Sequence, residues 1–152
     1  MCPDGNRRWE VVEFLATESR ADGFDVAPTG DYLAVDFHGQ IVVVPTEPNV
    51  GEKLAVASTP FRERGESYSP DGKHIAFVSD SSGRPHVYII PSGGGTAKRL
   101  SSTGTENVSP DWGKNGYITY CSRVGGKYRI IVANPKARTM RQLETDWADY
   151  ED

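Results

Sequence analysis

The sequence predicts an all-β fold made of β-propeller blades, and three observations support this prediction. Structural landmarks recur along the chain with a period in the low forties of residues, which is typical of blade-type repeats. The predicted central strands of each repeat are apolar on successive positions, as expected for strands covered on both faces. Helical periodicity is weak throughout, and the most helix-like stretch, 7–20, contains "RRWEVVEF", which favours an extended strand.

Three kinds of landmark define the period. They are the turn glycines, the ends of the third strands and the closing leucines. In chain order these are Gly30, Gly72 and Gly116, then Pro45, Pro91 and Asn134, and finally Leu54, Leu100 and Leu143. Because independent landmarks share one spacing, the chain is expected to repeat one supersecondary unit three times.

Each unit is predicted to be a blade of four antiparallel strands. The three complete blades cover about 22–58, 64–102 and 106–144, and the strands of the second are expected at 65–69, 74–79, 86–91 and 96–101. Partial strands are expected at 9–15 and 147–152. Since propeller rings typically hold four to eight blades, three blades leave the ring open. The ring is therefore expected to be truncated or closed by self-association, with a homodimer giving six blades.

The second and third strands carry the core prediction. Runs such as "IAFV", "VYII", "IVVV" and "RIIV" are apolar on both faces, which fits a sheet sandwiched between two neighbours. The first and fourth strands are more polar, as fits the lining of a central channel and the outer rim.

Turn chemistry joins the first two strands of each unit. Pro70-Asp71-Gly72 combines a fixed φ, a local hydrogen-bond acceptor and a residue that tolerates positive φ. In the third unit Gly113-Lys114-Asn115-Gly116 replaces Ser-Pro-Asp-Gly and leaves one residue fewer before the next strand. The register of the strand predicted at 117–122 is therefore left open.

These motifs resemble two propeller families. "SPDGKHIAFVSD" resembles the blade motif of TolB-like propellers, and "GTENVSPDWGKNGYITYCSRVGGKYRIIVANP" is similar to TolB itself. The front half, with "GFDVAPTGDYLAVDFHGQIVVVP", resembles the propellers of tricorn-type proteases. The change of character near residues 80–85 indicates a mosaic, natural or engineered.

The resemblance implies a non-catalytic scaffold that binds protein or peptide. TolB-type propellers dock protein partners at a channel mouth, and this is the expected function. A peptide-gating propeller segment of a tricorn-like protease system is one alternative. A recombined or designed fragment without native function is another. The compartment stays open, because a TolB-like protein would be periplasmic and a tricorn-like one cytoplasmic.

Composition narrows the classes of partner. The net charge is −4 with both signs interspersed, so no basic block exists to neutralise nucleic-acid phosphates. No apolar run is long enough to span a membrane. Cys2 and Cys121 make a poor disulfide framework, and Cys121 is expected to be a small buried hydrophobe. No Gly-x-Ser-x-Gly elbow, metal-ligand spacing or phosphate loop occurs in the sequence, so no catalytic residue, metal or cofactor is expected.

Three residues are candidates for binding at a channel mouth. Arg62 and Arg64 lie in "FRERGE", on the loop that enters the second blade, where an arginine can clamp a carboxylate. The competing interpretation is a solvated loop neutralised by Glu63 and Glu66. Trp112 is the third candidate, with packing between blades as the competing interpretation.

Overall fold

The computed structural model describes residues 21–47, 54–57 and 59–143 and contains only strands there. Twelve strands form three four-stranded antiparallel sheets, each a simple meander. This arrangement confirms the all-β prediction and the blade architecture. The strands predicted at 9–15 and 147–152 lie outside the described residues.

The three sheets follow one another along the chain, and each uses its strands in sequence order. The first sheet contains β1 (Ala21–Val26), β2 (Tyr32–Phe37), β3 (Gln40–Pro45) and β4 (Leu54–Ala57). The second contains β5 (Glu63–Tyr68), β6 (His74–Ser79), β7 (His86–Pro91) and β8 (Lys98–Arg99). The third contains β9 (Asn107–Trp112), β10 (Ile118–Val124), β11 (Lys127–Asn134) and β12 (Thr139–Gln142).

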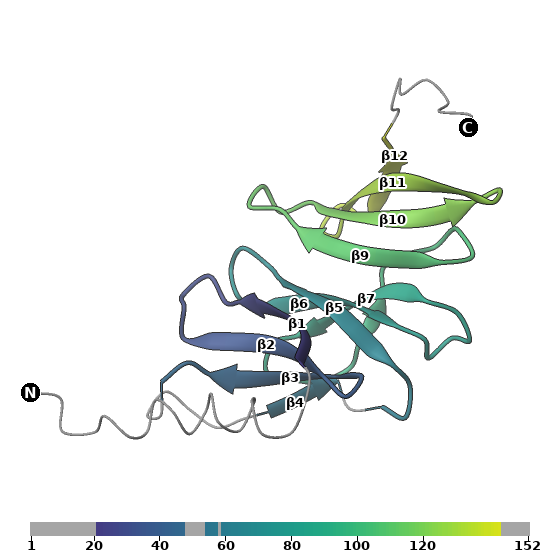
Figure 1. The fold of residues 1–152 in the computed structure, drawn as a ribbon. Helices are drawn as coiled ribbons and strands as arrows, with labels where there is room; N and C mark the ends of the chain where they lie inside the picture. The colour runs from purple at the N-terminus through teal and green to yellow at the C-terminus, as the bar shows by residue number, and fades with distance from the viewer. Residues whose placement is uncertain (1–20, 48–53, 58, 144–152) are drawn as a thin grey trace, which may run out of the picture.

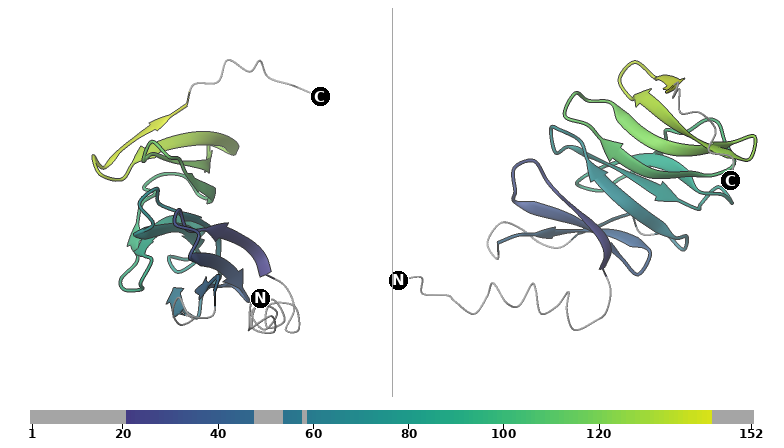
Figure 2. Two further views of the ribbon diagram at one scale, coloured as in Figure 1. Left: turned by 90° about the vertical axis from the view of Figure 1, so that its left-hand side faces the viewer. Right: turned by 45° about the horizontal axis from the view of Figure 1, so that its top comes forward.

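The sheets stack face to face in chain order, as Figures 1 and 2 show. Their first strands lie side by side, with β1 against β5 and β5 against β9. These are therefore the inner strands of three neighbouring blades, and β4, β8 and β12 are the outer ones. Within the described part of the chain the sheets do not close into a ring.

Apolar side chains fill both gaps between the sheets. Ala34, Ile41 and Val43 of the first sheet pack against Ile75 and Phe77 of the second. The other face of the second sheet presents Ala76 and Val87 to Ile118, Tyr120 and Ile131 of the third. The second sheet is thus covered on both faces, and this explains its runs of consecutive apolar residues.

The turn after each inner strand repeats one hydrogen bond. The N–H groups of Gly30, Gly72 and Gly116 donate to the carbonyls three residues earlier, each at 2.8 Å, and all three glycines have positive φ. The strand-closing bond that follows spans five residues in the second sheet, from Ser69 to His74, but four in the third, from Gly113 to Tyr117. The shorter third turn starts β10 at Ile118.

One of the three landmarks is corrected by the sheet registers. Leu100 and Leu143 are equivalent, because their N–H groups bond the carbonyls of Val87 and Ile130 at matching positions. Leu54 instead lies opposite Val43, the place that Lys98 takes opposite Ile89 in the second sheet. The interval between Leu54 and Leu100 fits the repeat, but the two leucines do not occupy equivalent positions in their blades.

Candidate functional site

The three candidate binding residues do not lie together. Arg62 directly precedes the inner strand β5 and Arg64 is its second residue, whereas Trp112 ends the inner strand β9. The main-chain N–H of Trp112 bonds the Oγ of Ser67, close to the end of β5. Neighbouring inner strands are parallel, so the arginines and the tryptophan occupy opposite ends of the blades.

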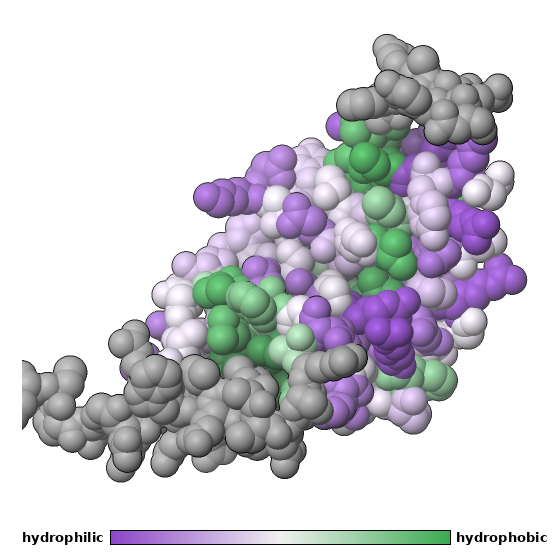
Figure 3. Space-filling model, viewed as in Figure 1, coloured by the Kyte–Doolittle hydropathy of each residue, from purple (hydrophilic) through white to green (hydrophobic). Residues whose placement is uncertain are grey.

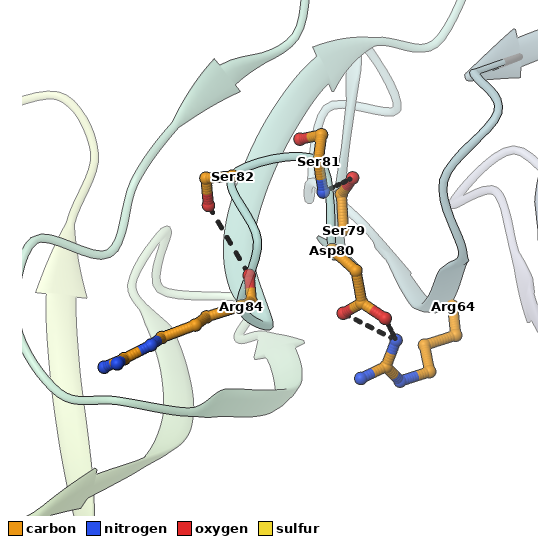
Figure 4. A network of polar contacts seen from close by, with 6 residues as sticks. All are labelled: Arg64, Ser79, Asp80, Ser81, Ser82 and Arg84. Carbon is orange, nitrogen blue, oxygen red and sulfur yellow. Dashed lines mark hydrogen bonds and ion pairs between the residues drawn. The ribbon is translucent and has the colours of Figure 1, made fainter.

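At the arginine end, Arg64 is already paired. Its guanidinium lies 3.2 Å from Oδ1 and 3.3 Å from Oδ2 of Asp80, at the start of the β6–β7 hairpin. Figure 4 shows this pair, with Arg84 on the same hairpin pointing away from it. Arg62 is exposed and lines a shallow hollow of about 500 Å³ with His38 and Phe61. Of these two arginines, Arg62 is therefore the one whose guanidinium has no ion pair within the described residues.

The expectation that Glu63 and Glu66 neutralise these arginines is wrong. Both carboxylates are buried, because their strand is covered on both faces. An oxygen of Glu63 accepts a hydrogen bond from the Thr59 hydroxyl at 2.8 Å. An oxygen of Glu66 accepts one from the main-chain N–H of Asp36 at 3.3 Å. These groups serve the contact between the first two sheets.

Burial raises the pKa values of these carboxyl groups above their usual range. Desolvation raises the pKa of Glu66 to about 7, and the neighbouring Asp36 and Asp25 carboxylates add to the rise. Desolvation also raises the pKa of Asp36 and that of Glu63. One oxygen each of Asp36, Glu63 and Glu66 is buried and has no hydrogen-bond partner among the described residues. Polar side chains of the inner strand β5 are therefore buried here.

A repeated polar bond ties each inner strand to the next. An oxygen of Asp25 accepts the N–H of Tyr68 at 2.6 Å, and the Oγ of Ser67 accepts the N–H of Trp112 at 2.9 Å. Asp25 and Ser67 lie opposite equivalent alanines, Ala34 and Ala76, in their sheets. In the third sheet Asp111 takes the corresponding place opposite Thr119, and its carboxylate is exposed.

A groove of about 530 Å³ lies at the tryptophan end, between the second and third sheets. We call it the 2–3 groove. Trp112 packs against the core between these sheets, and its ring centroid lies 6.3 Å from that of His74. The indole Nε1–H is buried without a hydrogen-bond partner in the described structure. Trp112 therefore packs between blades and also lines a surface groove.

The walls of the 2–3 groove combine rigid apolar residues with cations. Pro70, Pro91, Pro135 and Ile89 supply the apolar part. The cations are Lys98, Lys114, Lys136 and Arg138. None of the four has an ion-pair partner within the described residues. Sequence reasoning missed these cations because they are scattered over two turns and one outer strand, and only the fold brings them together.

Other chemistry is little supported by the described part of the chain. No three His, Cys, Asp or Glu side chains gather there as they would around a metal ion. The same residues include no helix of the length and hydropathy needed to cross a membrane. Cys121 is half-buried rather than buried as expected. The 2–3 groove combines cations with an apolar lining.

The comparisons with known proteins agree with this fold. The family model of the TolB beta propeller domain, PD40, matches residues 28–151. The chain belongs to this family. Among curated proteins, Tricorn protease homolog 1 of Streptomyces coelicolor is 26% identical over 99 residues, a match that covers 64% of this chain and 9% of that protein.

Solved structures show the same architecture. TolB from Acinetobacter baumannii superposes with a TM-score of 0.63 at 22% identity, over 85% of this chain and 36% of that one. The tricorn protease superposes with a TM-score of 0.65 at 19% identity, over 87% of this chain and 13% of that one. The TolB-like and tricorn-like resemblances are thereby confirmed for the fold. This TolB-family chain spans well under half the length of these relatives.

Proposed function

We propose that this chain is a non-catalytic propeller scaffold that binds a protein or peptide segment in the 2–3 groove. The observation that carries the proposal is the groove itself. It is lined by Trp112, whose indole N–H is buried without a partner in the described structure, and by three prolines. A concave site with an apolar lining and a few convergent polar groups is the usual form of a ligand site. Membership of the TolB propeller family supports a role in protein interaction.

A selection from random peptides tests this function. The full chain is immobilised and presented with a phage-displayed library of random peptides, and individual binders are then measured by fluorescence anisotropy. We expect peptides with micromolar affinity, about −8 kcal/mol. Their affinity should fall in Trp112→Phe, which keeps an aromatic ring but loses the N–H donor. Failure to enrich any binder, or binders indifferent to every groove substitution, would overturn the proposal.

We further propose that two copies close a six-bladed ring. Asp25 and Ser67 each accept a main-chain N–H of the next inner strand. Asp111 occupies the equivalent position in the third sheet, so it can accept an N–H from the inner strand of a fourth blade. In the first sheet the N–H of Val26, at the equivalent place, donates to the carboxylate of its own neighbour Asp25, at 2.9 Å. Figure 3 shows apolar patches over the first and third sheets. Large apolar side chains are exposed on both of these sheets, among them Phe24 of β1 and Ile130 of β11. A head-to-tail dimer joins these two ends.

The mass in solution decides whether the ring closes in this way. Sedimentation equilibrium should give twice the chain mass of 16.7 kDa, and Asp111→Leu should shift the balance toward the single chain. A chain that stays monomeric at high micromolar concentration would overturn ring closure without touching the groove.

The alternative function is peptide gating for a tricorn-like protease system. The relative among tricorn protease homologs favours it. Gating requires peptides to pass through the channel beside the inner strands, so binding should respond to substitutions of Arg62 rather than of Trp112. The same library binders, measured against Arg62→Gln and Trp112→Phe, separate the two functions.

A further inference from the structure

The repeat supplies two equivalent grooves, and their comparison indicates what the 2–3 groove binds. The corresponding groove between the first and second sheets, here the 1–2 groove, holds about 410 Å³. Tyr68 takes the place of Trp112 there, and its hydroxyl is also buried, with no partner in the described part of the chain. The aromatic floor and its unpartnered polar atom are thus shared features of the repeat.

Charge is what separates the two grooves. Among the residues that the structure describes, the lining of the 1–2 groove contains no lysine or arginine and one carboxylate, Asp71. The lining of the 2–3 groove contains four cations and the same Asp71. That carboxylate is occupied, because its Oδ1 accepts hydrogen bonds from the Ser69 hydroxyl at 2.6 Å and the Lys73 N–H at 3.1 Å.

The fold does not require these cations. Lys98 lies opposite Ile89, where Leu54 lies opposite Val43 in the first sheet. Lys136 follows the end of β11 by two residues, where Gly93 follows the end of β7. Blades of the same design therefore accept leucine or glycine at these places. The positive charge is an addition to this groove, on a chain whose net charge is −4.

A proline also opens the rim of the 2–3 groove. In the first two sheets a hydroxyl after the third strand caps the turn glycine, with Thr46 bonding the Gly30 carbonyl and Ser92 the Gly72 carbonyl, each at 2.8 Å. The equivalent residue of the third sheet is Pro135, which has no side-chain donor. The carbonyl of Gly116 therefore lacks this cap, and the rim is lined by a rigid apolar ring.

We infer that the 2–3 groove binds an acidic, extended peptide segment of a partner protein. Carboxylates of the segment pair with Lys98, Lys136 and Arg138, and a main-chain or side-chain acceptor takes the Trp112 Nε1–H. A single-stranded nucleic acid fits less well. Its bases need an open aromatic face to stack on, and the Trp112 ring is packed against the core and lies beside His74. This inference rests on the proposed peptide-binding function and gives it a ligand class.

Two matched peptides and one oligonucleotide test the ligand class. The probes are fluorescein-labelled Glu-Asp-Leu-Pro-Glu-Asp-Leu-Gly, its amide counterpart Gln-Asn-Leu-Pro-Gln-Asn-Leu-Gly, and an eight-nucleotide oligo-dT. Anisotropy is measured with the full chain at low and high salt. We expect the acidic peptide to bind at least about ten-fold more tightly than the amide peptide, with an affinity that falls as salt screens the charges.

Charge variants locate the site. Lys98→Gln combined with Lys136→Gln should weaken the acidic peptide about five-fold or more and leave the amide peptide unchanged. Arg84→Gln is the matched control, since it removes one exposed cation from a hairpin at the opposite end of the blades. Leu54→Lys should raise the affinity of the 1–2 groove for the acidic peptide.

The outcomes separate the ligand class from the function. Equal binding of both peptides, with both lost in Trp112→Phe, would overturn the acidic preference and leave the peptide-binding function standing. Tighter binding of oligo-dT, no effect of the paired lysine substitutions, or no binding of either peptide would also overturn the inference. The peptide library described above then decides the function on its own.

Discussion

The carboxylate of Asp25 accepts the main-chain N–H of Tyr68 at 2.6 Å, and the equivalent Ser67 repeats this bond to the next sheet. A side chain of one blade thus satisfies a backbone donor of the next. The bond works together with the apolar contact between sheets, because it fixes the position of neighbouring inner strands.

Removing this acceptor should loosen the first sheet from the second. Asp25→Ala leaves the Tyr68 N–H without its partner in a half-buried place, so the free energy of unfolding should fall by about 1–2 kcal/mol. Urea unfolding followed by circular dichroism measures the change. Asp31→Ala is the control, because Asp31 is an exposed turn residue. An equal loss in both variants would mean that the bond between blades is not the cause.

The buried Glu66 should make stability fall as pH rises. Its pKa is about 7 in the folded chain and near 4.5 when unfolded, so the folded state holds the extra proton between these values. The contribution of Glu66 to the free energy of unfolding is therefore fully present below pH 4.5. It is lost as the pH rises through 7, by about 2 kcal/mol once solvent screening is allowed for. Glu66→Gln should flatten the curve of unfolding free energy against pH. An unchanged curve would contradict the assignment.

His86 should act in the opposite direction. It is buried, its Nδ1 lies 2.9 Å from the Ser101 Oγ, and burial together with Arg99 lowers its pKa. Since the folded state resists protonation, its contribution to stability is present above pH 6.5 and lost as pH falls below it. The difference in melting temperature between the parent chain and His86→Gln should therefore shrink or reverse on acidification from pH 7 to pH 5.

Two equivalent inner-strand positions test backbone strain. Gly65 has φ +64° and Ser109 has φ +54°, each at the irregular point of its strand pairing. A Cβ on Gly65 would meet only the Pro110 Cδ, at 3.7 Å, so Gly65→Ala should cost only the conformational strain, about 1 kcal/mol. Ser109→Gly should stabilise by up to about 1 kcal/mol. Thermal unfolding measures both changes: the melting temperature should fall in Gly65→Ala and rise in Ser109→Gly.

The blade architecture could be predicted from the sequence because the features that mark each blade, its turns and its apolar strands, are each encoded within a short stretch of chain. The turn glycines and the doubly apolar strands such as Ile75–Val78 repeat along the chain, and the sheets follow the same order. Leu54 shows the limit of spacing alone, because connections of different length can place a residue at the right interval but at the wrong position in the blade.

The candidate site was much less predictable. Arg62, Arg64 and Trp112 were each plausible locally, yet the direction of the inner strands separates the arginines from the tryptophan. Their expected partners were also misplaced, because burial of Glu63 and Glu66 depends on the neighbouring sheet. The groove cations come from segments up to 40 residues apart, such as Lys98 and Arg138, so no local motif marks them.

The shortness of β8 has a practical consequence for the molecule. Only two residue pairs join it to β7, and Lys98 and Arg99 are both exposed. The glycine-rich loop before it, 93–95, should therefore tolerate an inserted sequence without disturbing the packing between the sheets. A loop or tag inserted there should lie on the outer surface of the protein, beside one wall of the 2–3 groove.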